Sequence, residues 1–138
     1  MENLSVVLQQ LATGCTCAVF DGTTLLRSTK RGVAPLLEWL EQDLNLRQFC
    51  AADKVVGKGA AFLYLLLGVR KLYAAVISVP ALMLLRQNGV AVTFTTLVPA
   101  IRNRDLTGYC PIESVVLDCT EPETARIRIN EKLKQLQK

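Results

Sequence analysis

Histidine is absent from all 138 residues of the sequence. Its absence excludes Ser-His-Asp and Cys-His catalysis, metal sites with histidine ligands and acid–base chemistry by imidazole. Aromatic residues are scarce, at 6%, and the 16 basic residues outnumber the 12 acidic ones only slightly. Because nucleic-acid binding calls for a concentrated basic surface and for aromatic side chains that stack on bases, we expect no nucleic acid among the partners.

No hydrophobic run is long enough to cross a membrane. The most apolar tract, residues 60–85, is interrupted by glycine, proline and charged residues, whereas a membrane-spanning helix needs about 20 consecutive apolar residues. The first residues, 1–4, also lack the basic and apolar regions of a secretory signal. We therefore expect a cytoplasmic protein that makes no membrane contact.

The five cysteines are odd in number and follow no regular spacing. This pattern favours free thiols in a reducing compartment over a disulfide framework. Cys15 and Cys17 have one residue between them, where a zinc knuckle has two, so we expect them to pack as buried thiols. No dinucleotide or phosphate-loop motif is complete either. The sequence therefore predicts no metal and no cofactor.

The length, with 51% apolar and 20% charged residues, indicates one globular domain over residues 1–138. Hydrophobic periodicity predicts helices over residues 1–12, 35–44, 53–67, 80–88, 110–117 and 121–136. It predicts strands over residues 15–20, 23–28, 71–79 and 90–95, with a hairpin turn at Asp21-Gly22, and leaves 48–52 as a strand or a loop. This order predicts an α/β fold in which helices sandwich a mixed sheet.

Residues 53–61, at the head of the most apolar predicted helix, form the first candidate site. Gly57 and the small residues after it allow close backbone approach, and the unpaired N–H groups at a helix start attract anions. Lys58 would complete a cradle for an oxyanion or a phosphate. In the alternative interpretation, the small residues serve tight helix packing while Lys54 and Lys58 extend to solvent.

Cys110 forms the second candidate site. It stands directly before Pro111 at a predicted helix start, where the helix dipole lowers the pKa of a thiol and makes the thiolate more available. Glu113, at the third helical position, is equally typical of a capping arrangement. The alternative is an inert cysteine at an ordinary helix start, because no partner base is evident.

The loop Arg102-Asn103-Arg104-Asp105 is the third candidate site. Its two guanidinium groups are suited to hold a phosphate or a carboxylate. The alternative is that these charges face solvent or pair with one another, as most charge runs do.

A series of motifs follows in order along residues 15–117. They are Gly32-x-x-Pro35-Leu36-Leu37, Asp53-Lys54-Val55-Val56-Gly57-Lys58 with Ala60-Ala61, Val76-Ile77-Ser78-x-Pro80-Ala81, Asn88-Gly89, Asn103-Arg104-Asp105 and Gly108-x-Cys110-Pro111-x-Glu113. In this order and spacing they resemble a small prokaryotic family of unknown function within the cytidine-deaminase-like superfamily. The resemblance implies a cytidine-deaminase-like three-layer α/β/α sandwich.

Active deaminases of that superfamily place His/Cys-Ala-Glu at the start of the buried helix and Pro-Cys-x-x-Cys at the next helix start. Here these slots read Lys58-Gly59-Ala60 and Pro80-Ala81-Leu82-Met83-Leu84. The resemblance therefore implies that the metal ligands and the catalytic glutamate are missing, which excludes deamination by zinc-activated water. We infer a retained pocket in which Lys58 supplies the positive charge that relatives take from the metal. Its expected lining is Asp53, Lys58, Ser78, Cys110 and Asn103.

Three hypotheses for function follow. The first is a metal-free binding domain for a nucleotide-like or other small anionic ligand. Its expected binding residues are Asp53, Gly57, Lys58, Ser78, Asn103 and Arg104. The second is a thiol-dependent enzyme, with Cys110 as nucleophile and Lys58 or Asp53 as proton carrier. The third is a structural or regulatory subunit that forms a homo-oligomer.

Overall fold

The computed structural model describes residues 2–102 and 110–136 of the chain. The helices are α1 (Glu2–Ala12), α2 (Ala34–Glu41), α3 (Lys58–Leu67), α4 (Val79–Gln87), α5 (Pro111–Val116) and α6 (Pro122–Leu136). The strands are β1 (Cys17–Phe20), β2 (Leu25–Ser28), β3 (Cys50–Val56), β4 (Lys71–Ser78) and β5 (Ala91–Val98). Within the described ranges, no helix is both long enough and apolar enough to cross a membrane.

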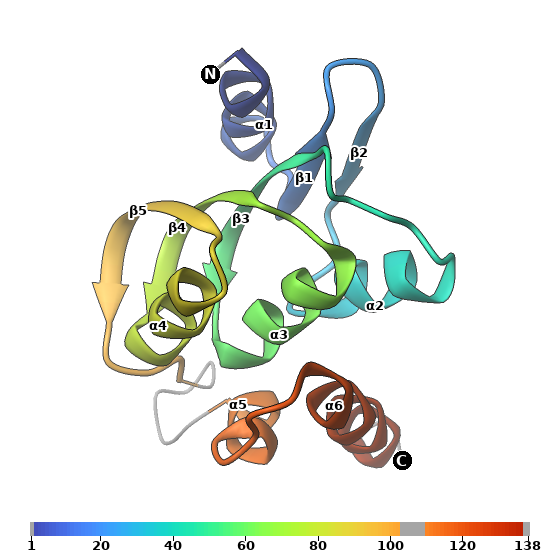
Figure 1. Cartoon of the computed structure of the whole chain (residues 1–138), viewed down its shortest axis with the longest axis vertical. Coiled ribbons are helices and arrows are strands. Elements are labelled where there is room, and N and C mark those ends of the chain that lie inside the picture. Colours follow the sequence, from blue (N-terminus) through green and yellow to red (C-terminus); the bar gives the residue numbers. More distant parts are fainter. Residues whose placement is uncertain (1, 103–109, 137–138) are drawn as a thin grey trace.

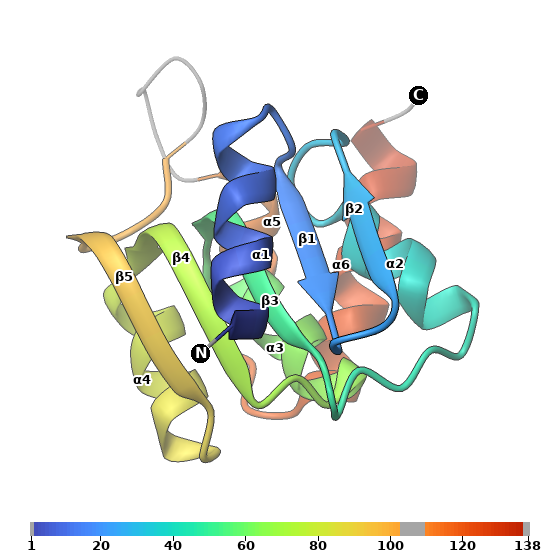
Figure 2. The same cartoon turned by 90° about the horizontal axis from the view of Figure 1, so that it is seen from above.

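The strands form one mixed sheet in the order β2-β1-β3-β4-β5 (Figure 2). β1 runs antiparallel to both of its neighbours, β2 and β3. β3, β4 and β5 run parallel to one another. Parallel neighbours need crossover connections, which α3 and α4 provide here. The starts of α3 and α4 consequently lie at the same end of the sheet, where β3 and β4 finish.

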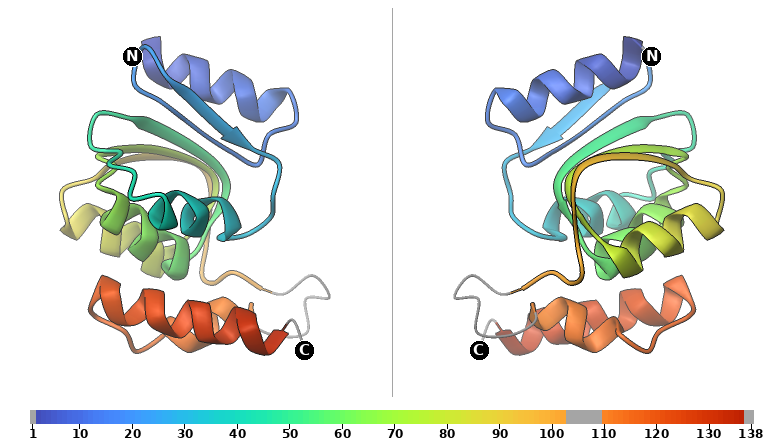
Figure 3. Two further views of the ribbon diagram at one scale, coloured as in Figure 1. Left: turned by 90° about the vertical axis from the view of Figure 1, so that its right-hand side faces the viewer. Right: turned by 90° about the vertical axis from the view of Figure 1, so that its left-hand side faces the viewer.

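Helices cover both faces of the sheet, as Figure 1 shows. α1 packs on one face against β1 and β3. α2, α3 and α4 lie on the opposite face, and α5 and α6 pack against α3 on the side away from the sheet (Figure 3). This arrangement confirms the expected three-layer α/β/α sandwich with a mixed sheet, and the α5–α6 pair adds an outer cover to it.

Residues 53–56 are the main difference from the sequence-based expectation, which placed them in a helix. They complete β3, where Asp53 pairs with Ala74 of β4 and Val56 pairs with Ile77. Gly57 is extended, with φ −97° and ψ −178°, and α3 begins only at Lys58. A short apolar run is compatible with a strand or a helix, so periodicity alone did not separate the two. Residues 48–52, left open before, contain the start of the same strand.

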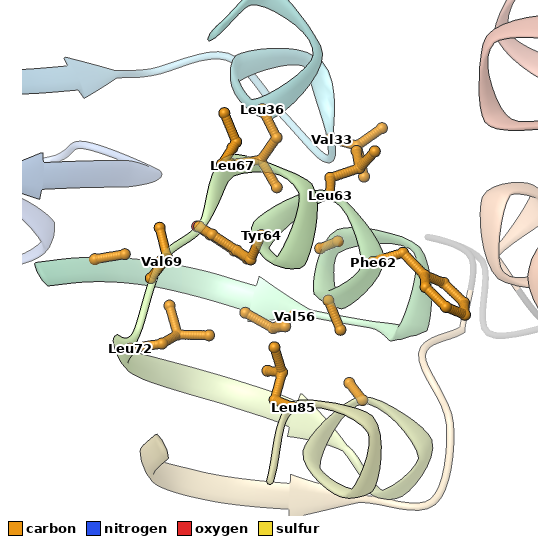
Figure 4. Packing of buried hydrophobic residues seen from close by; sticks show 14 of the residues in the cluster. Val33, Leu36, Val56, Phe62, Leu63, Tyr64, Leu67, Val69, Leu72 and Leu85 are labelled. Carbon is orange, nitrogen blue, oxygen red and sulfur yellow. The ribbon is translucent and has the colours of Figure 1, made fainter. Parts of the chain in front are cut away.

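Helix α3 lies at the centre of the hydrophobic core. Its side chains Phe62, Leu63 and Tyr64 are fully buried. Figure 4 shows them among residues from α2, the sheet and α4. The helix ends at Gly68, whose left-handed φ of 89° lets its N–H group bond back to the last turn. Because α3 is covered on most sides, the polar groups at its start need partners within the protein.

Candidate functional site

A pocket of about 290 Å³ opens beside the start of α3. It lies where β3 ends, and α5 and the segment before α2 complete its walls. The lining residues are Thr16, Arg31, Gly32, Val33, Asp53, Lys54, Val55, Gly57, Ala60, Ile101, Cys110, Ile112 and Glu113. Most of this lining is apolar. The pocket is therefore suited to a small molecule that buries an apolar body and makes a few polar contacts.

The carboxylate of Glu113, on α5, caps the start of α3. The Lys58 N–H group donates to Glu113 Oε1 at 2.6 Å, and the Gly59 N–H group donates to Oε2 at 2.9 Å. Two of the N–H groups that a helix start leaves unpaired are thereby satisfied by a charged acceptor. We expected Glu113 to cap its own helix, and the structure shows that it caps a different one. The anion position at the start of α3 is thus filled from within the chain.

Gly57 and Gly59 make room for this carboxylate. A Cβ atom at position 57 would overlap the Glu113 carboxyl group, and one at position 59 would come within 3.0 Å of Ile112. The sequence predicted a close approach to these glycines, and the group that approaches is a side chain of the same protein.

The Lys58 amine points away from the pocket. Its Nζ donates to the Leu117 carbonyl at 2.8 Å and lies 5.6 Å from the centre of the Phe62 ring. A lysine at the last carbonyls of a helix is favourable, because the helix dipole is negative there. Lys58 therefore secures the end of α5 and does not line the pocket, so the expected cationic cradle is replaced by the Glu113 carboxylate.

Asp53 belongs to a buried hydrogen-bonded chain of three side chains. Tyr64 donates its hydroxyl proton to Asp53 Oδ2 at 2.7 Å, and the same hydroxyl lies 3.1 Å from Cys17 Sγ. Asp53, Tyr64 and Cys17 are only 5%, 0% and 2% exposed. Since Tyr64 has one hydroxyl proton, the Cys17 thiol donates to Tyr64 whenever Asp53 is ionised. The end of this chain at Asp53 is the end that reaches the pocket.

Burial changes the protonation of these groups. It raises the pKa of Asp53 to about 7, against hydrogen bonds from Tyr64 and from backbone amides, which lower it. Burial also raises the pKa of Glu113, although the amides of Gly59 and Lys58 oppose the rise. The pKa values of Cys17 and Tyr64 are raised far above their usual range, chiefly by burial. Asp53 is therefore the member of the chain that titrates near neutral pH.

The other expected site residues are divided between the pocket and the core. Asp53, Gly57 and Cys110 line the pocket. Ser78 is fully buried and accepts a hydrogen bond from the Ala81 N–H group at 3.2 Å, so it caps α4. Asn103 and Arg104 lie outside the described residues.

Sequence reasoning did not identify Tyr64, Thr16 or Arg31 as site residues. Tyr64 sits in an apolar helix, where a hydroxyl gives no pattern of its own. The pairing of Cys17 with Asp53 on neighbouring strands was the missing signal, because it places the thiol next to the carboxyl group and the Tyr64 hydroxyl.

A double-mutant cycle tests the Glu113 cap. Gly57→Ala should destabilise the protein by about 2 kcal/mol, because its methyl group displaces the carboxylate from two backbone donors. In Glu113→Ala, the same glycine substitution should have a much smaller effect, since the overlap is gone. Urea unfolding of the four proteins measures the coupling. As a control, Gly57→Ala should add independently to Glu131→Ala on α6, and additivity with Glu113→Ala would contradict the cap.

The pH dependence of stability tests the burial of Asp53. In the unfolded chain Asp53 ionises near its ordinary pKa of 3.8, and in the folded protein near 7. The folded state therefore binds the extra proton between these values, so stability is lost as the pH rises through this window. Relative to Asp53→Asn, the wild-type free energy of unfolding should fall by about 2 to 3 kcal/mol between about pH 5 and about pH 8. Urea titrations measure it, and a difference independent of pH would contradict the raised pKa.

Comparison with known proteins places the chain in a family. The model of the TM1506 family, a domain of unknown function (DUF1893), matches residues 6–133. No curated protein matches the chain.

The fold is similar to the crystal structure of a DUF1893 family protein (TM1506) from Thermotoga maritima. The two share 27% sequence identity, with a TM-score of 0.83, over 98% of this chain and 91% of the other. The matched region includes β3, α3 and α5, which form the pocket. The chain therefore belongs to the DUF1893 family.

Proposed function

We propose that this protein is a small-molecule binding domain whose ligand occupies the pocket beside the start of α3. The observation behind the proposal is Asp53, a carboxyl group that is 5% exposed and borders a mostly apolar pocket. Burying a carboxyl group without a cation is unfavourable, so such groups concentrate at functional sites. An apolar pocket with a few polar groups is the usual form of a ligand site.

A nucleotide-like ligand suits the charges around this pocket. A planar ring would lie against the apolar walls near Asp53. Arg31 and Lys54 line the same pocket and are exposed, so they are available to an anionic substituent at the mouth. The N–H groups of Lys58 and Gly59 are already engaged by Glu113. We therefore assign the anion to Arg31 and Lys54 in place of Lys58.

We also propose a distant relation to the cytidine-deaminase-like superfamily. Support comes from the strand order, from the antiparallel β1, and from the two helices that start after β3 and β4. Neither helix start carries the residues that bind zinc in active deaminases. Among the described residues, no group of three or more His, Cys, Asp or Glu side chains could hold a metal ion. The proposed pocket lies at the first of these helix starts.

Thermal-shift measurements with AMP, GMP, CMP, UMP and ribose 5-phosphate test the proposal. A ligand at one hundred times its Kd stabilises the folded state by about 2.7 kcal/mol, which raises the Tm by several degrees. Arg31→Ala and Lys54→Ala should reduce this shift, because each removes a cation at the mouth. Lys134→Ala, which changes an exposed amine outside the pocket, should leave it unchanged. Absence of a shift with all five compounds would refute the nucleotide-like ligand.

A thiol-dependent enzyme is the second candidate, because Cys110 and Asp53 line the same pocket. Cys110 would act as nucleophile, and Asp53 would accept its proton. Iodoacetamide should then alkylate Cys110 faster than it alkylates free cysteine at neutral pH, and Asp53→Asn should slow the reaction. Mass spectrometry of peptides gives the rate for each cysteine. A rate at or below that of free cysteine would reject this candidate.

We further propose a cytoplasmic protein that forms homo-oligomers. The five cysteines are free, which suits a reducing compartment. β5 is an edge strand with exposed residues along much of its length, and such edges are suited to pairing. Self-association stays a prediction.

A further inference from the structure

The interior of the pocket is acidic. Asp53 and Glu113 both line it, and both are at least nine-tenths buried. The cations that line the pocket, Arg31 and Lys54, are exposed, in contrast to the two carboxyl groups. A ligand therefore meets positive charge on entry and carboxyl groups inside.

The two carboxyl groups differ in the hydrogen bonds that their oxygens accept. Each oxygen of Glu113 accepts one backbone N–H group, at 2.6 and 2.9 Å. Asp53 accepts one short hydrogen bond, from Tyr64, and the Val55 N–H group approaches its other oxygen at 3.4 Å. The Lys54 amide and the Cys17 thiol also lower the pKa of Asp53 through weaker hydrogen bonds, so only one of its roughly four acceptor positions is filled at short distance.

No cation of the protein pairs with Asp53 in the described ranges. The salt bridges there join Lys30 with Glu38 and Arg128 with Asp118. The partners of Asp53, Tyr64 and Cys17, are neutral groups whose own ionisation burial suppresses. A cationic group on a ligand would offset the free-energy cost of burying the charge of Asp53.

We propose that the innermost group of the ligand is a planar, amidine-like cation that pairs with Asp53. This inference rests on the proposed function, which places the ligand in this pocket, and it adds the chemistry of the ligand's inner end. Two parallel N–H groups match a carboxylate better than a single point charge does. The apolar walls suit an attached ring, whereas a carboxylate or phosphate at this depth would meet two acidic groups.

Three ligands of nearly the same shape test this chemistry. Benzamidine is a planar cation, benzamide is its neutral counterpart and benzoate is its anionic counterpart. Their binding to the wild-type protein can be measured by two-dimensional ¹H–¹⁵N NMR at about pH 8, above the pKa of about 7 for Asp53. Benzamidine should bind at least tenfold more tightly than benzamide and should shift the amide signals of residues 53–60. Benzoate should shift none of these signals.

Two variants assign the preference to Asp53. Asp53→Asn keeps an acceptor for Tyr64 but loses the charge, so benzamidine should bind it no more tightly than benzamide. Asp118→Asn removes a carboxylate paired with Arg128 outside this pocket and should keep the full preference. The three-ligand comparison on the wild-type protein remains decisive if Asp53→Asn does not fold. Equal binding of benzamidine and benzamide, binding of none of the three, or an unchanged preference in a folded Asp53→Asn would overturn the inference.

The outcome separates this inference from the function on which it rests. One outcome is that nucleotides bind through Arg31 and Lys54 while benzamidine binds no more tightly than benzamide. In that case the pocket is a ligand site, and the proposal of a cationic inner group is wrong. If no nucleotide or sugar phosphate binds but benzamidine does, the inner cation stands and the nucleotide-like ligand is wrong.

Discussion

The structure depends on a reciprocal clasp between α3 and α5. The Glu113 side chain of α5 accepts the first N–H groups of α3, and the Lys58 side chain of α3 donates to the Leu117 carbonyl at the end of α5. Since α3 is buried on most sides, unpaired N–H groups at its start would destabilise the fold. The clasp satisfies these groups and fixes α5 as a wall of the pocket. The clasp also explains why glycine occupies positions 57 and 59, because a larger residue at either position would crowd the contact between α3 and α5.

The clasp also determines which charges line the pocket. It fills with a carboxylate the position where a helix start otherwise attracts an anion, and it directs the Lys58 amine elsewhere. What remains within the pocket is Asp53, held by Tyr64 and backed by Cys17. The polarity is thus the reverse of the one expected from the sequence: the carboxyl groups that line the pocket are buried, and the cations that line it are exposed. A cationic inner group with an anionic outer group on one ligand is consistent with this arrangement.

Local patterns in the sequence were sufficient for most of the fold. The hairpin at Asp21-Gly22 forms as expected, with the Asp21 carboxylate accepting the N–H groups of Thr23 and Thr24, and helix α4 begins next to Pro80. The strand at residues 53–56 was missed, because its apolar residues fit the periodicity of a helix as well as that of a strand.

The site was less accessible from the sequence, because its contacts are long-range. Glu113 and Lys58 are 55 positions apart, and nothing in the spacing of either motif links them. Likewise, Cys17 comes next to the Tyr64 hydroxyl only when β1 pairs with β3 in the observed register. The glycines at 57 and 59 indicated a close approach but not the group that approaches.

The protonation of Asp53 is the most direct test of this account, because the proposed ligand chemistry requires a buried carboxyl group at the pocket. Its side-chain carboxyl carbon can be followed by ¹³C NMR during a pH titration of the protein without added ligand, with assignment by comparison with Asp53→Asn. We predict a titration midpoint at about 7, and Asp118, paired with Arg128 at the surface, should titrate below its ordinary pKa. A midpoint for Asp53 close to the ordinary aspartate value of about 4 would contradict the account.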